Sequence, residues 1–80
     1  EQQVSASQST TQITEQQAKE KALTHAGVQE SAAQKLKIKL DEDDGRMVYE
    51  VEFYSGGMEY DYEVDASTGE IIQAQKEADD

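Results

Sequence analysis

The 80-residue sequence has no cysteine, few basic residues and no long apolar segment. Without cysteine, neither a disulfide nor a thiolate metal site can stabilise the fold. Seven lysines and arginines against 18 acidic residues give a net charge of −11, which argues against binding to nucleic acids or anionic membranes. No apolar run approaches the length of a membrane span. What remains is one small acidic domain with a modest core, whose charge permits cationic partners.

The sequence also has no recognisable arrangement of catalytic, cofactor-binding or metal-binding residues. The glycine pair at 56–57 is too short for a phosphate-binding loop and leads into a strand. The acidic run at 41–45 matches the start of a calcium-binding EF-hand loop, but Gly45 and Arg46 stand where that loop needs a ligand and a glycine. We therefore expect no enzyme activity, no cofactor and no specific metal site.

A short amphipathic helix is predicted at residues 13–27, after a polar segment at 1–12. The polar segment is either a flexible tether or a remnant without a role of its own. Thr14 and Gln17 have the spacing of a capping box, and Gly27 is the expected left-handed residue after the helix. This helix is too short and too weakly apolar to be stable alone, so it must lie on a sheet. Its apolar face consists of Ala18, Ala22, Leu23 and Ala26.

His25 is the single histidine of the chain and falls near the end of this predicted helix. A protonated imidazole is favoured there by the helix dipole. A lone histidine, with no second ligand nearby in the sequence, is more often a surface residue than a base or a metal ligand.

Alternation of apolar and polar residues predicts four strands after the helix. The fold class is α+β, with one N-terminal helix packed on a four-stranded antiparallel meander sheet. The domain should span residues 13–76, and residues 77–80 should fray. The strands are expected at 35–40, 46–54, 58–65 and 70–75. The inward-facing residues are expected to be Leu36, Ile38, Leu40, Met47, Tyr49, Val51, Phe53, Met58, Tyr60, Tyr62 and Val64.

Keeping apolar residues opposite one another suggests a register for the two hairpins. It pairs Leu40 with Met47 in the first hairpin and Phe53 with Met58 in the second. The outer face then carries lysines on the first strand beside a group of carboxylates. We call these lysines the lysine strip, and it consists of Lys35, Lys37 and Lys39. Its predicted cross-strand neighbours are Lys37–Glu50, Lys35–Glu52, Glu52–Glu59 and Glu50–Asp61.

The carboxylates of this outer surface form the candidate interaction face. We call it the acidic face, and it consists of Glu50, Glu52, Glu59, Asp61 and Glu63. One interpretation is a solvated surface that keeps a marginally stable protein soluble. The other is a docking surface for a basic partner or a low-affinity cation site, in which case binding should weaken with added salt.

The turn at 65–71 has a clear structural interpretation. Asp65 can accept hydrogen bonds from the backbone N–H groups that follow it, and Gly69 can supply the positive φ that the turn needs. Valine at position 69 should therefore destabilise the fold by more than about 1 kcal/mol.

Taken together, these segments resemble the PepSY domain family. The resemblance rests on the helix ITEQQAKEKALTHAGV, the strand YEVEF and the segment GGMEYDYEVDASTGEII, in this order and spacing over about residues 13–75. It implies that five motif residues are fold-making: Tyr49, Val51, Phe53, Asp65 and Gly69.

The resemblance also implies a function and a location. PepSY domains occur in propeptides of secreted thermolysin-like metallopeptidases and in bacterial secreted, lipoprotein and membrane-anchored proteins. The implied function is a non-catalytic module that restrains or inhibits a secreted peptidase, or contacts another cell-envelope protein. The alternative is a structural or sensory envelope domain whose acidic face binds cations or basic wall components. The resemblance implies a location outside the cytoplasm, either extracellular or membrane-anchored. The chain begins at Glu1 rather than Met, as expected of a processed or trimmed product, and this start is compatible with the removal of a signal peptide or anchor.

Overall fold

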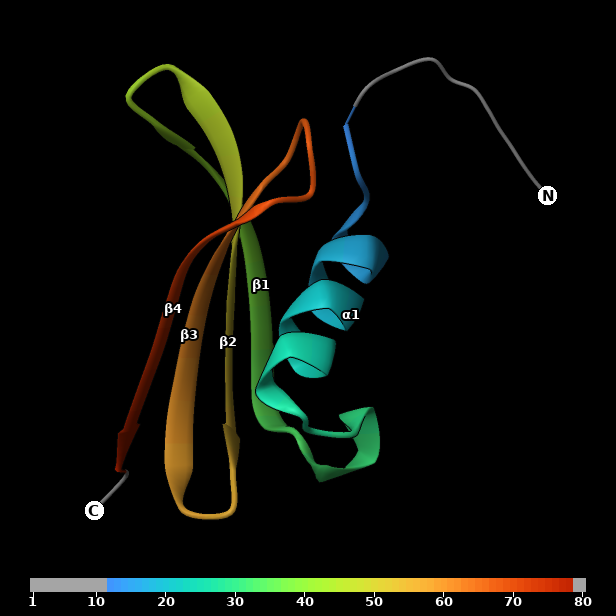
Figure 1. Ribbon diagram of the computed structural model, residues 1–80, viewed down its shortest axis with the longest axis vertical. Helices are drawn as coiled ribbons and strands as arrows, with labels where there is room; N and C mark the ends of the chain where they lie inside the picture. The colour runs from blue at the N-terminus through green and yellow to red at the C-terminus, as the bar shows by residue number, and fades with distance from the viewer. Residues whose placement is uncertain (1–11, 79–80) are drawn as a thin grey trace, which may run out of the picture.

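The computed structural model describes residues 12–78 and consists of one helix followed by a four-stranded antiparallel sheet (Figure 1). The predicted α+β fold is confirmed. The strands follow one another in the order β1-β2-β3-β4, so each pairs with its neighbours in the sequence. The polar segment expected at 1–12 lies outside the described residues except for Gln12. The elements are α1 (Glu15–Ala26), a 3-10 turn η1 (Glu30–Ala32), β1 (Gln34–Asp43), β2 (Arg46–Ser55), β3 (Met58–Asp65) and β4 (Ile71–Ala78).

The helix α1 has the two ends that its sequence predicts. The Thr14 hydroxyl accepts from the backbone N–H of Gln17, and the Gln17 side chain accepts from the backbone N–H of Thr14, which completes the capping box. Gly27 ends the helix at φ 73°. Just before the helix, the Ile13 N–H donates to the Ala66 carbonyl at 2.7 Å. This bond ties the start of α1 to the β3–β4 turn.

Both hairpins turn more tightly than expected, so the predicted register is wrong by two residues in each. Asp44-Gly45 and Gly56-Gly57 form two-residue turns in which all four residues have positive φ. Such turns match the twist of the flanking strands and allow pairing to begin at once. Because the error is two residues and the side-chain period is also two, most side chains keep their predicted face. The observed pairs are Leu40–Tyr49, Ile38–Val51, Lys37–Glu52, Lys39–Glu50, Val51–Tyr62, Phe53–Tyr60, Glu52–Asp61 and Glu50–Glu63.

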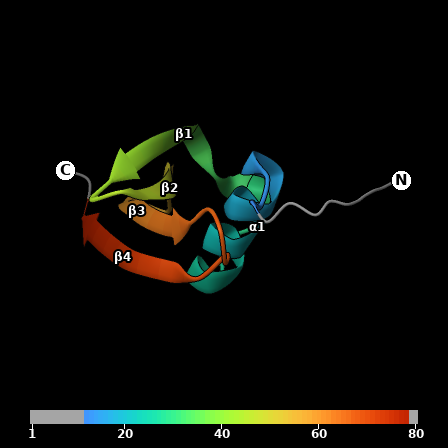
Figure 2. The same ribbon diagram turned by 90° about the horizontal axis from the view of Figure 1, so that it is seen from above.

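The core lies between α1 and the central strands (Figure 2). Its largest fully buried member is Phe53, whose ring stacks on Tyr60 with centroids 4.9 Å apart. On the helix side Ala18 and Ala22 are fully buried, and their small side chains let the helix lie close to the sheet. Burying a phenylalanine stabilises a domain by about 1.5–3 kcal/mol, so this ring is a large part of a small core.

Two residues expected in the core are exposed, and one expected outside is buried. Leu40 and Met47 are 40% and 38% exposed, because the β1–β2 hairpin extends past the N-terminal end of α1 (Figure 1). Val48 alternates with the inward-facing residues of its strand, which predicts that it lies on the solvated face, yet it is 1% exposed and lies outside the main core cluster. It pairs with Asp41 and Asp65, where the turn after β3 folds back onto β2.

The last strand is longer than predicted. β4 pairs with β3 from Ile71 to Ala78, with one irregularity near its start. Residues 77 and 78, which were expected to fray, therefore belong to the sheet. Residues 79–80 lie outside the part of the chain that the structure describes.

Candidate interaction face

The five carboxylates of the acidic face are brought together on the side of the sheet opposite α1. They come from alternate positions of β2 and β3, and every one of them is half-buried. Glu52 lies directly opposite Asp61, and Glu50 lies opposite Glu63. Carboxylate oxygens of Glu52, Glu59 and Asp61 lie within 4.8 Å of one another. Like charges this close repel, so the face is a site of electrostatic strain.

Burial and this crowding together raise the affinity of several carboxylates for protons. Burial and then the Glu52 and Glu77 charges raise the pKa of Asp61 above its usual range. A hydrogen bond with Glu52, burial and nearby charges raise the pKa of Glu59. The pKa of Glu50 is raised mainly by burial and by Asp41, against the lowering effect of Lys39. In each case the folded state stabilises the neutral acid, relative to the carboxylate, more than the unfolded chain does.

The lysine strip borders the acidic face without neutralising it. Lys37 lies opposite Glu52, and Lys39 lies opposite Glu50. Within residues 12–78, however, the ion pairs closer than 4.0 Å are Lys19–Glu30 and Arg46–Asp65, and neither belongs to this face. Lys37, Lys39 and the carboxylates of the acidic face other than Glu59 line a shallow concavity of about 490 Å³, together with Gln73 and Gln75 of β4. Chemically, the surface offers carboxylate oxygens to a basic side chain or to a hard cation.

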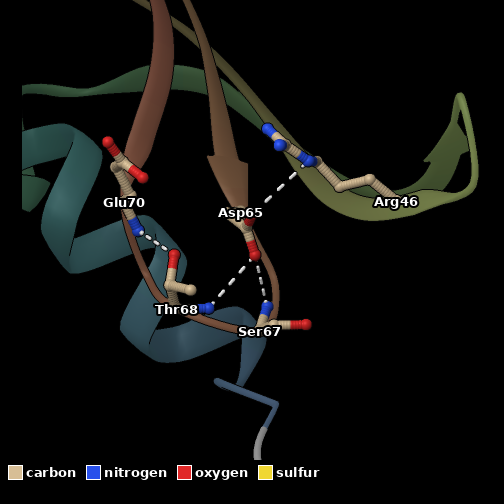
Figure 3. Close-up of polar contacts among 5 residues, drawn as sticks. All are labelled: Arg46, Asp65, Ser67, Thr68 and Glu70. Atoms are coloured by element: carbon tan, nitrogen blue, oxygen red, sulfur yellow. Dashed lines mark hydrogen bonds and ion pairs between the residues drawn. The ribbon is translucent and has the colours of Figure 1, made fainter.

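Asp65 organises the turn between β3 and β4 (Figure 3). Its Oδ1 accepts from the backbone N–H groups of Ser67 and Thr68 at 2.7 and 3.1 Å, as its position in the sequence predicts. Its Oδ2 lies 3.6 Å from the Nε of Arg46 at the start of β2. Asp65 is only 8% exposed, so these contacts satisfy a buried charge.

The other motif residues lie in the core or in this same turn. Val51 and Phe53 are almost fully buried, and Tyr49 is 6% exposed. The Tyr49 hydroxyl donates to the Ile13 carbonyl at 3.1 Å, which connects β2 to the start of the helix. Gly69 has φ 80° and is buried against Lys21 of α1. All four positions join the helix to the sheet.

Sequence reasoning missed the contact of His25 with the sheet. Its Nδ1 lies 3.0 Å from the Tyr62 hydroxyl, and the two rings meet edge to face with centroids 5.4 Å apart. The pairing of Arg46 with Asp65 was also missed. Both contacts join segments distant in the sequence, so only the packing of α1 and the pairing of β2 with β3 bring them together.

Comparison with known proteins identifies the family. The family model of PepSY, described as "Peptidase propeptide and YPEB domain", matches residues 12–74. The chain belongs to the PepSY family. Members are generally non-catalytic propeptide or regulatory modules, typically extracellular or associated with the cell envelope. Within residues 12–78, α1 is too short and too polar to cross a membrane.

A similar curated protein is Spy1430 of Streptococcus pyogenes serotype M6, which is described as uncharacterized. It is 42% identical over 65 residues, which cover 81% of this chain and 50% of that protein. The PepSY chain thus spans about half the length of this relative. No solved structure matches the chain.

Proposed function

We propose that this PepSY chain is a non-catalytic binding module that restrains or inhibits a secreted peptidase through protein–protein contact. The observation that carries the proposal is the family match, because it covers residues 12–74 and the description of the family names peptidase propeptides together with the YPEB domain. The proposed setting is extracellular or attached to the cell envelope. The proposal assigns the chain no cofactor and no nucleic-acid partner.

The acidic face is the proposed contact surface. Its half-buried carboxylates repel one another, and a basic partner would relieve that repulsion when it binds. A net charge of −11 would also attract a positively charged surface from a distance. Charge complementarity of this kind affects the association rate and the choice of partner more than the final affinity.

The test is a titration of a purified thermolysin-like metallopeptidase secreted by the source organism. The wild-type domain at micromolar concentration should slow peptide hydrolysis. The double variant Glu52→Gln, Asp61→Asn should inhibit the peptidase less than the wild type does. The control variant Glu42→Gln, Asp43→Asn removes the same charge from exposed positions outside the acidic face. Unchanged hydrolysis at micromolar wild-type domain would reject the peptidase role.

A second candidate function is an envelope domain that binds cations or basic wall components. The close approach of the Glu52, Glu59 and Asp61 carboxylates favours it. This function predicts weak binding that declines steeply with added salt and has no effect on proteolysis. Calcium titration followed by NMR separates the two functions, because cation binding would shift acidic-face signals without any peptidase present.

A further inference from the structure

We propose that the free edge of β4 binds an extended segment of the protein partner, which adds a fifth strand to the sheet. The segment would carry apolar or small residues at alternate positions and lysine or arginine between them. This inference rests on the proposed function for the premise that the partner is a protein, and it names a surface that the family match does not indicate.

Within residues 12–78, no strand pairs with the outer edge of β4, so the backbone hydrogen-bonding groups along this edge have no strand partner there. The Asp65 N–H donates to the Glu70 carbonyl at 2.8 Å, so the backbone groups of alternate β3 residues from 59 to 65 point toward β4. Their partners Gln73, Gln75 and Glu77 use their backbone groups in that pairing. The N–H and C=O groups of Ala74 and Lys76 therefore point away from the sheet. Such an edge is a template for a further strand.

The other edge of the sheet is protected, whereas β4 is not. β1 carries three lysines, has Lys35 at φ 54°, and shows an irregularity in its pairing between residues 34 and 37. Lysines and irregular backbone are the usual means of blocking an edge strand. From residue 73 to 78, β4 pairs regularly with β3, carries one lysine and is exposed throughout.

The inner side of a strand added at β4 would face existing depressions beside the helix. One of about 230 Å³ is lined by His25, Tyr60, Tyr62 and Ala74, among others. A second, more open one of about 650 Å³ adjoins it at His25 and reaches Ile71 and Gly69. Ala74 lines the smaller of the two depressions, and its small side chain occupies little of that space. Apolar side chains of the added strand fit here, since every second residue of a strand points to the same face.

The outer side of the added strand would lie on the same side of the sheet as the acidic face. The outward side chains of β4 are Gln73, Gln75 and Glu77, which pair with Glu63, Asp61 and Glu59. The added strand would lie two strand spacings, about 10 Å, from β3, so a lysine or arginine side chain that extends across β4 can approach these carboxylates. Apolar residues inside and basic residues outside define the proposed partner segment.

The experiment uses the whole chain and a short acetylated, amidated peptide that alternates lysine with valine or alanine. We expect the peptide to bind and to slow amide hydrogen exchange at Ala74 and Lys76 of the wild-type chain. Ala74→Pro removes one outward N–H, a position where an edge strand tolerates proline. It should weaken binding at least about tenfold, through the lost hydrogen bond and the clash of the ring.

Leu40→Pro is the matched control, because it removes an outward N–H from the opposite edge at a residue that is 40% exposed. It should change the affinity less than about twofold, a difference that corresponds to no lost hydrogen bond. Circular dichroism of both variants checks whether they fold. The wild-type exchange measurement stands independently of them if either unfolds.

Three outcomes would overturn the inference. The first is equal affinity of the wild type and Ala74→Pro. The second is equal binding of a peptide with the same composition but all lysines in one block, since this would indicate attraction to the acidic face alone. The third is self-association of the chain through β4 in sedimentation equilibrium. Peptidase inhibition is measured separately: inhibition that Ala74→Pro leaves intact rejects the edge and keeps the proposed function, whereas peptide binding at β4 without inhibition does the reverse.

Discussion

Alanine at position 69 is the sharpest test of how the helix and the β3–β4 turn fit together. Gly69 has φ 80°, and a Cβ added there would lie 2.7 Å from the Cε of Lys21. The left-handed backbone alone costs an L-residue about 1–2 kcal/mol. The steric overlap adds less, because the Lys21 side chain is exposed and flexible enough to move away. We expect Gly69→Ala to lower the free energy of unfolding by about 1.5–2.5 kcal/mol.

The control is Gly45→Ala in the β1–β2 turn. Gly45 has φ 78°, almost the same as Gly69, but a Cβ there would have no heavy atom within 4 Å. It should therefore show the backbone cost alone, about 1–2 kcal/mol. The double variant Lys21→Ala, Gly69→Ala removes the overlap. Its decrease in the free energy of unfolding, measured relative to Lys21→Ala, should therefore equal the decrease for Gly45→Ala.

The measurements are urea unfolding and thermal melting followed by circular dichroism. For a domain of this size, each kcal/mol corresponds to a fall of about 4–8 °C in the melting temperature. Gly69→Ala should thus melt roughly 6–20 °C lower than the wild type. An unchanged melting temperature would refute the assignment of strain to this turn. Equal losses for Gly69→Ala and Gly45→Ala would refute the steric contribution of Lys21.

Three further predictions concern the carboxylates. Asp65→Ala should lower the free energy of unfolding, measured in urea, by about 2–3 kcal/mol, because it leaves the N–H groups of Ser67 and Thr68 without their acceptor. Asp65→Asn keeps an oxygen at this position, so its free energy of unfolding should fall by about half as much. Glu52→Gln should raise the free energy of unfolding by a few tenths of a kcal/mol, because it removes a like charge opposite Asp61; a loss would contradict the repulsion. The raised pKa values on the acidic face mean that the folded state binds protons more tightly than the unfolded chain. The melting temperature should therefore rise as the pH is lowered from 7 toward about 4.5. A melting temperature that decreases over this pH range would show that other groups dominate.

The fold could be predicted from the sequence because its signals are local and agree with one another. Thr14, Gln17 and Gly27 mark the helix ends by side-chain and backbone chemistry that needs no tertiary contact. The strands are marked by alternation, and neighbouring strands joined by short turns pair as a meander. These patterns determine element type and facing, which is why the composition of the acidic face could be predicted before its geometry.

The register and the extent of burial needed information that alternation does not contain. A two-residue error in pairing keeps every apolar residue opposite another, so only the turn type separates the predicted from the observed register. Asp44-Gly45 and Gly56-Gly57 were the available signals, because both dipeptides favour two-residue hairpin turns. The exposure of Leu40 and Met47 depends on how far α1 reaches along the sheet, which no local pattern states.

The acidic face and the β4 edge adjoin, and their combination is more selective than either alone. An acidic surface attracts any basic protein, and an open strand edge pairs with any extended chain. A segment that satisfies both must be extended and must place its basic residues at every second position. Its backbone bonds would resist added salt, while the contacts of its basic side chains would weaken. A partner bound through both features should therefore keep part of its affinity at high salt, whereas one held by the acidic face alone should be released.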